Sequence, residues 1–138
     1  MASIMRLRPP AGEMDRILNV DQRVGPLRDC PNLPGDVEAV QRLVALAVTE
    51  FASGSGFPLP QPTGRFDVLT GFYVYHLQAR QQARYRTVVV DGVVSPARGS
   101  VYGGGIWTIV NFNNIVFLHN RPEWEALLRR FANRPADS

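Results

Sequence analysis

The chain has 138 residues, of which 45% are hydrophobic and 20% charged, as is usual for one globular domain and unlike a disordered chain. No apolar run approaches the roughly 18–20 residues that a membrane-spanning helix needs, so we expect no membrane partner. The net charge is +3, and all fifteen basic residues are arginines scattered along the chain. Because no nucleic-acid-binding motif accompanies them, we do not expect a nucleic-acid partner either.

Residues 1–31 are predicted to form an irregular N-terminal arm. They hold three prolines before Pro31 and one short amphipathic piece, residues 13–20. The arm has no apolar core of the kind found in a secretory signal, so we expect a protein made in the cytoplasm without a signal peptide. The single cysteine, Cys30, cannot build an internal disulfide framework, and we expect a loop residue rather than a nucleophile.

A first helix is predicted from Asp36 to about Ala52. Asp36 is a favourable N-cap residue, and apolar residues follow it at spacings of three and four. These residues are Val37, Val40, Leu43, Val44 and Val48. The serine and glycine residues at positions 53–56 are predicted to end the helix.

A second helix is predicted over residues 68–84, with Asp67 as its N-cap. Leu69, Tyr73 and Leu77 fall near one face of this helix. Gly71 lowers its helix propensity by about 1 kcal/mol relative to alanine. We therefore expect Gly71 to allow close packing against another helix.

Residues 103–138 are predicted to be an extension made of a β-hairpin, from Ile106 to His119, and a helix. The hairpin strands would be rich in β-branched and aromatic residues, and the pair Asn113 and Asn114 tolerates the positive φ of a tight turn. Glycines 103–105 would form a flexible joint before it. The last helix is predicted to begin near Pro122. Its apolar face would consist of Trp124, Leu127, Leu128 and Phe131.

Three segments, taken in order, resemble a known family. They are residues 32–43 (NLPGDVEAVQRL), 64–78 (GRFDVLTGFYVYHLQ) and 90–96 (VDGVVSP). Together they resemble the peptidoglycan-binding domains of cell-wall hydrolases, phage lysins and type VI secretion-associated proteins. The resemblance implies a mainly α fold, with a small three-helix domain over residues 32–102 followed by the hairpin and helix extension.

Most of the matched residues are expected to be structural. The core candidates are Val37, Val40, Leu43, Phe66, Val74, Leu77, Val90 and Val94. Asp91 is expected to bond backbone amides in its own turn rather than a ligand. Trp107 and Trp124 are expected to pack within the extension.

A peptidoglycan site would need a shallow groove with polar side chains and an aromatic platform. Stem peptides add carboxylates, which arginine grips with its fork of donors. The polar and aromatic residues that flank the matched motifs are the candidate ligand-binding residues, although side chains of these types are more often simply solvated. They are Arg65, Asp67, Tyr75, Gln78, Arg80 and Arg98.

We expect no catalytic residues, no metal and no cofactor. Only two histidines are present, His76 and His119, whereas zinc takes three or four ligands. Glycoside hydrolysis usually needs two positioned carboxylates, and Glu38 and Glu50 have no evident partner. The chain is therefore predicted not to be an enzyme.

Two functions remain open. The first is a non-catalytic module that targets itself, or an associated effector or lytic protein, to peptidoglycan at the periplasm or cell wall. Delivery by a phage tail or a type VI secretion-like machine is what the resemblance implies. The second is an adaptor of such a machine that has lost glycan binding. It would contact an effector, spike or tail protein through an unpaired strand edge of the C-terminal extension. Departures from the family pattern favour this second function, such as Leu77 in place of phenylalanine and Ser95 in place of glycine or aspartate.

Overall fold

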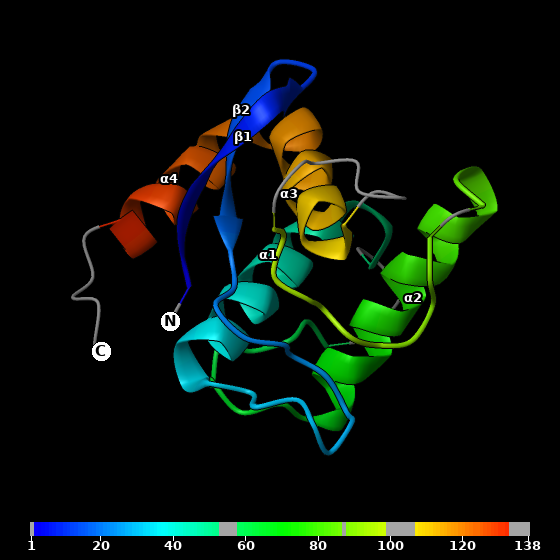
Figure 1. The fold of residues 1–138 in the computed structure, drawn as a ribbon. Helices are drawn as coiled ribbons and strands as arrows, with labels where there is room; N and C mark the ends of the chain where they lie inside the picture. Colours follow the sequence, from blue (N-terminus) through cyan, green and yellow to red (C-terminus); the bar gives the residue numbers. More distant parts are fainter. Residues whose placement is uncertain (1, 53–57, 87, 99–106, 133–138) are drawn as a thin grey trace.

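The computed structural model describes residues 2–52, 58–86, 88–98 and 107–132. Within them the fold is mixed, with one antiparallel hairpin and four helices (Figure 1). The elements are β1 (Ser3–Ala11), β2 (Met14–Asn19), α1 (Pro34–Ala52), α2 (Val68–Arg84), α3 (Thr108–His119) and α4 (Arg121–Ala132). None of the described helices is long and apolar enough to cross a bilayer.

Three of the helices were predicted correctly. α1 and α2 end at Ala52 and Arg84 as expected, and Asp67 caps α2 by accepting a hydrogen bond from the Thr70 amide at 2.8 Å. α4 begins one residue before Pro122, and its four predicted apolar residues are all buried. Of the core candidates, only Phe66 and Val90 are half-buried instead of buried.

The expected close packing at Gly71 has a different partner. A Cβ added there would lie 3.2 Å from the ring of Phe66, and no other helix comes within 4 Å of it. Phe66 belongs to the loop before α2, so the absence of a side chain at Gly71 makes room for a ring from that loop. The expectation of helix-on-helix packing at this glycine was wrong.

The prediction of an irregular N-terminal arm was also wrong. β1 and β2 pair in antiparallel register, with Ser3 opposite Asn19 and Arg6 opposite Arg16. The prolines that hid the strand, Pro9 and Pro10, lie where the register is interrupted between Arg6 and Ala11. Because the ladder is broken at this point, the missing proline N–H groups remove no regular ladder bond.

The C-terminal hairpin does not exist, because residues 108–119 form helix α3. Ile109, Phe112, Asn113 and Val116 are all buried, and their spacing of three, four and seven is that of one helix face. α3 packs against α1, α4 and β2 (Figure 1). Packing on three sides therefore overrode the β-propensity of its residues.

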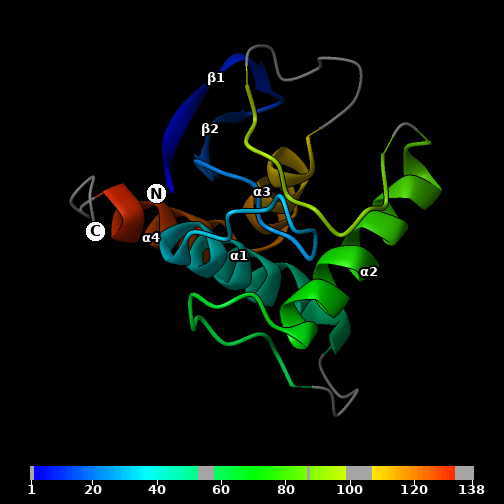
Figure 2. The same cartoon turned by 60° about the horizontal axis from the view of Figure 1, so that its bottom comes forward.

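A single core joins all six elements. One cluster of buried residues includes Leu7, Ile17, Leu43, Leu77, Phe112 and Trp124, one from each element in chain order. In Figure 2, α2 lies at one side of the molecule and α4 at the other, with α1 and α3 between them. Helices α3 and α4 therefore pack onto the α1 region instead of forming a separate unit.

Buried side-chain amides tie this core together. The Asn113 amide joins three elements: its Oδ1 accepts from Leu18 N at 2.9 Å and from Trp124 Nε1 at 3.1 Å. Its Nδ2 donates to Leu18 O at 2.9 Å and to Ile109 O at 2.8 Å. Asn113 is fully buried, so every polar atom of its side chain is satisfied inside the protein.

Three more buried amides hold loops in the same way. Gln41 on α1 bonds the Gly64 amide and the Arg65 carbonyl, at 3.0 Å each. Gln78 on α2 bonds the Gly92 amide at 2.8 Å and the Val93 carbonyl at 3.0 Å. Asn19 pairs with both backbone groups of Ala97. The predicted turn role of Asp91 is confirmed by its 2.9 Å bond from Val93 N.

Asp36 does not cap α1, because the helix begins two residues earlier at Pro34. Its buried carboxylate accepts hydrogen bonds from Asp21 N at 3.0 Å and Gln22 N at 2.9 Å. Asp36 thus fixes the segment that follows β2 onto the start of α1. Burial raises the pKa of this carboxyl above 3.8, outweighing those two backbone bonds, which lower it.

The variant Asp36→Asn is expected to lower the free energy of unfolding by about 1–3 kcal/mol near pH 4, because an amide oxygen replaces only one of two acceptors. The raised pKa means that wild-type stability falls as the pH rises from 3.8 through the folded-state value. The asparagine of the variant does not titrate, so the variant does not lose stability in this range. The difference in free energy of unfolding between wild type and Asp36→Asn should therefore become smaller toward pH 7. Urea unfolding of both proteins across this range measures it, and a difference that widens with pH would contradict the assignment.

Candidate functional site

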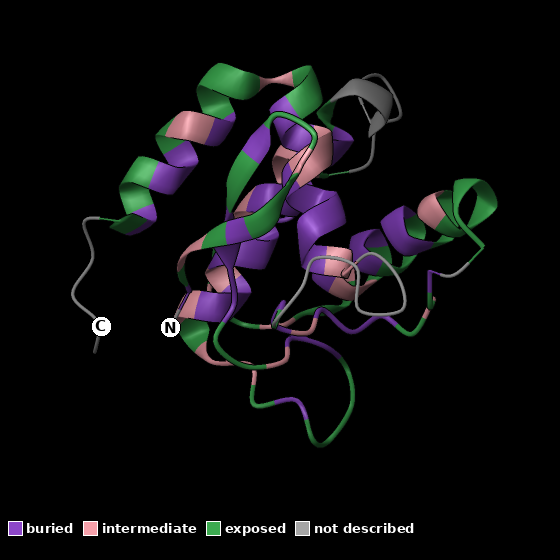
Figure 3. Ribbon diagram, turned by 45° about the horizontal axis from the view of Figure 1, so that its top comes forward, coloured by how far each residue is buried: buried purple, intermediate pink, exposed green. Residues whose placement is uncertain are grey.

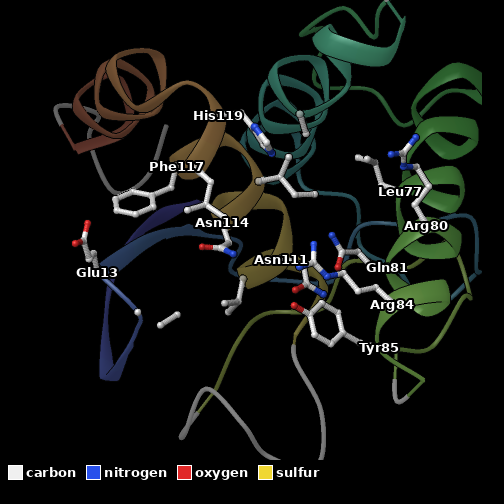
Figure 4. A pocket seen from close by; sticks show the side chains of 16 residues that line it. Glu13, Leu77, Arg80, Gln81, Arg84, Tyr85, Asn111, Asn114, Phe117 and His119 are labelled. Atoms are coloured by element: carbon white, nitrogen blue, oxygen red, sulfur yellow. The ribbon is translucent and has the colours of Figure 1, made fainter.

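A cleft of about 660 Å³ opens between α2 and α3 (Figure 4), within the usual size range of small-ligand sites. The buried apolar residues that line it are Ala47 of α1, Leu77 of α2, and Val110 and Phe117 of α3. The hairpin turn, residues 11–13, forms one end. The cleft therefore has an apolar base supplied by the protein core.

Helical spacing places polar residues on the α2 wall of the cleft. Arg80, Gln81 and Arg84 follow Leu77 at intervals of three, four and seven, so α2 presents them on one face. Across from them α3 contributes its own polar residues, which are Asn111, Asn114 and His119. The exposed C-terminal half of α2 leaves the arginine wall accessible (Figure 3).

The charges of the cleft favour an anionic ligand. Arg80 and Arg84 line one wall, and Glu13 is the one acidic residue among the described lining residues. Glu13 lies at the hairpin end, where its carboxylate is 3.4 Å from the guanidinium of Arg121. The α2 side of the cleft is therefore lined by two cationic side chains.

Asn111 is an exception among the buried amides. Its side chain is 6% exposed, and its Nδ2 is buried without a hydrogen-bond partner. Asn19, Gln41, Gln78 and Asn113 use both their amide oxygen and their amide nitrogen in hydrogen bonds. An unsatisfied buried donor is costly, so this one in a cleft wall identifies a position where a ligand acceptor would be stabilised.

The six sequence-predicted site residues do not come together. Only Arg80 lines the cleft. Asp67 lies thirteen residues earlier on α2, about 20 Å away along the helix axis. Gln78 is 1% exposed and committed to the 91–93 turn and to Thr108. Arg65, Tyr75 and Arg98 are exposed outside the cleft lining.

Asp67 is explained by its cap role. The Thr70 hydroxyl and amide both donate to its carboxylate, and the hydroxyl bond is the main reason that the pKa of Asp67 lies below its usual value. A carboxylate engaged at a helix start is a structural group. Its place at the far end of α2 from Arg80 separates it from the cleft.

Sequence reasoning missed Gln81, Arg84, Asn111, Asn114 and His119. The spacing of Arg80 and Arg84 relative to Leu77 was available as a signal, because it places both arginines beside a core residue of the same helix. The residues of α3 were hidden by the hairpin prediction for 106–119, which placed Asn111 in a strand and Asn114 in the turn.

Among the described residues, no group of three or more His, Cys, Asp or Glu side chains could hold a metal ion. No family model, curated protein or solved structure matches the chain.

Proposed function

We propose that the protein is a non-catalytic peptidoglycan-binding module that places itself, or an associated effector or lytic protein, on the bacterial cell wall. The observation that carries this proposal is the α2–α3 cleft, which combines an apolar base with cationic and amide-rich walls. The resemblance of residues 32–102 to peptidoglycan-binding domains suggests the same class of ligand. Delivery by a phage tail or a type VI secretion-like machine belongs to this proposal.

The cleft chemistry suits a ligand made of sugars and peptides. Amide side chains such as Gln81 and Asn114 donate and accept hydrogen bonds, which matches hydroxyl and acetamido groups. The guanidinium groups of Arg80 and Arg84 match the carboxylates of stem peptides. Glu13 is the single carboxylate of the described lining, whereas glycosidases usually use two, so we propose binding without hydrolysis.

Co-sedimentation with insoluble peptidoglycan sacculi tests this proposal. Wild-type protein is expected to bind saturably, and Arg84→Ala to weaken binding about five- to tenfold through loss of one charge-assisted contact. Arg65→Ala removes an exposed arginine outside the cleft and should bind like wild type. Sedimentation no greater than that of an unrelated protein of similar charge would refute the proposal.

The adaptor function remains the second candidate, on a different surface from the one first expected. Residues 108–119 offer no strand edge, since they form the largely buried helix α3. Instead, Val68, Phe72 and Tyr75 of α2 are 90%, 52% and 56% exposed and lie on one helix face. Exposed apolar residues grouped in this way are typical of protein contacts.

A purified effector, spike or tail protein that binds this face would favour the adaptor function. The complex should be lost with Phe72→Glu and kept with Arg84→Ala, measured by size-exclusion chromatography. Sacculus binding that persists in Phe72→Glu would instead assign wall targeting to the cleft and leave the exposed face of Val68, Phe72 and Tyr75 without a role in it.

A further inference from the structure

The Nδ2 of Asn111, which has no hydrogen-bond partner, lies in the same corner of the cleft as the guanidinium of Arg84. Figure 4 shows Asn111 on the α3 wall beside Gln81, Arg84 and Tyr85 of the α2 end. The Arg84 guanidinium carbon lies 5.7 Å from the centroid of the Tyr85 ring. Within the described part of the chain, no carboxylate pairs with Arg84. One corner of the cleft thus holds an amide donor and a guanidinium, both without an anionic partner.

The amide of Asn111 and the guanidinium of Arg84 together suit a carboxylate better than a neutral carbonyl group. A neutral carbonyl oxygen could satisfy Asn111 Nδ2 but would leave the Arg84 charge unpaired. A carboxylate has two coplanar oxygens, so one can accept from the amide and the other from the planar guanidinium. The one acidic lining residue, Glu13, belongs to the hairpin end of the cleft and is engaged with Arg121.

We propose that this corner, formed by Asn111 and Arg84, is a carboxylate site that binds the free C-terminal carboxylate of a peptidoglycan stem peptide. The inference rests on the proposed function for its ligand and adds to it the chemical group that is recognised. It predicts that the module prefers stem peptides with a free acid end over those whose ends are amidated or cross-linked.

The fold gains nothing from the unpartnered Nδ2 of Asn111, whereas a binding role accounts for it. Leucine has the same number of side-chain heavy atoms as asparagine and a higher helix propensity. Asn111→Leu removes a buried polar group that has no partner, so it should leave the melting temperature unchanged or raise it. A residue that weakens the fold but is needed for binding is expected at a ligand site.

The test is an NMR titration of the full chain with N-acetyl-D-alanyl-D-alanine as the free acid, as the C-terminal amide, and with inorganic phosphate. Wild type is expected to bind the acid at least tenfold more tightly than the amide or phosphate, with a large shift of the Asn111 side-chain NH₂ signals. Asn111→Leu and Arg84→Ala should each lose about tenfold in affinity for the acid. Arg129→Ala, on the exposed face of α4, is the control.

Equal affinity for the acid and the amide would overturn the inference, and so would unchanged affinity for the acid in Asn111→Leu. Phosphate that binds as tightly as the acid would show a general anion site and overturn the carboxylate assignment. The sacculus experiment separates the two proposals. Sacculus binding without acid preference would overturn the carboxylate site alone. Acid-specific peptide binding without sacculus binding would overturn wall targeting alone.

Discussion

Asn113→Leu is expected to lower the free energy of unfolding by about 4 kcal/mol, a large part of the total stability of a small domain. The substitution leaves three buried groups without partners: the backbone N–H and C=O of Leu18 and the Nε1 of Trp124. Each such group costs about 1–3 kcal/mol. The same change removes the side-chain hydrogen bonds that join α3 to β2 and to α4, so we expect the hairpin to detach first.

Asn111→Leu is the matched control for this prediction. It makes the same chemical change two positions earlier on the same helix, at a buried asparagine whose Nδ2 has no partner. Urea unfolding should show a large loss for Asn113→Leu and no loss for Asn111→Leu. Equal destabilisation of the two variants would contradict both the role of Asn113 and the unsatisfied state of Asn111.

The double variant Arg80→Glu with Arg84→Glu is expected to reduce sacculus binding by more than a hundredfold. It replaces two cations on the cleft wall by two anions, which repel the stem-peptide carboxylates that the arginines would attract. The effect is larger than loss of one hydrogen bond because attraction is replaced by repulsion. Co-sedimentation over a range of protein concentrations measures it.

A double variant on α4, Arg129→Glu with Arg130→Glu, makes the same change in net charge away from the cleft. Both residues are exposed, and neither lines the α2–α3 cleft. This control should bind within about threefold of wild type, because distant exposed charges are largely screened at physiological salt. A similar loss in both double variants would mean that binding depends on net charge and not on the cleft.

Local signals explain which elements could be predicted. α2 has an N-cap at Asp67, a regular apolar face and a clear end, and α4 has proline near its start and charges that match its dipole. Such features depend on neighbours within a few residues. They are therefore readable without knowing the tertiary structure.

The elements that were missed depend on distant contacts. α3 contains many residues with strand preference, and its apolar face includes Asn113, which reads as a turn residue. Only its partners, Leu18 and Trp124, make asparagine suitable for the core. The N-terminal hairpin was missed because its prolines hid the alternation, and the interruption of pairing that accommodates them is visible only in the register.

The candidate site was predictable only in part, because some of its features depend on local sequence and others on distant contacts. Arg80 was identified from its residue type and place on α2, and it lines the cleft. Gln78 was interpreted as a ligand contact but is buried in hydrogen bonds to the 91–93 turn, which is a tertiary feature. Asn111 could not be predicted as a site residue, because this requires knowing that residues 108–119 form a helix and that no neighbour pairs with its Nδ2.

The most direct test of the account is an NMR map of the surface that contacts soluble peptidoglycan fragments released from digested sacculi. Signals from the two cleft walls, including Arg80, Arg84, Asn111 and His119, are expected to shift together and to saturate. Shifts confined to Arg65 and Tyr75, or no shifts at all, would contradict the assignment of the α2–α3 cleft as a peptidoglycan site.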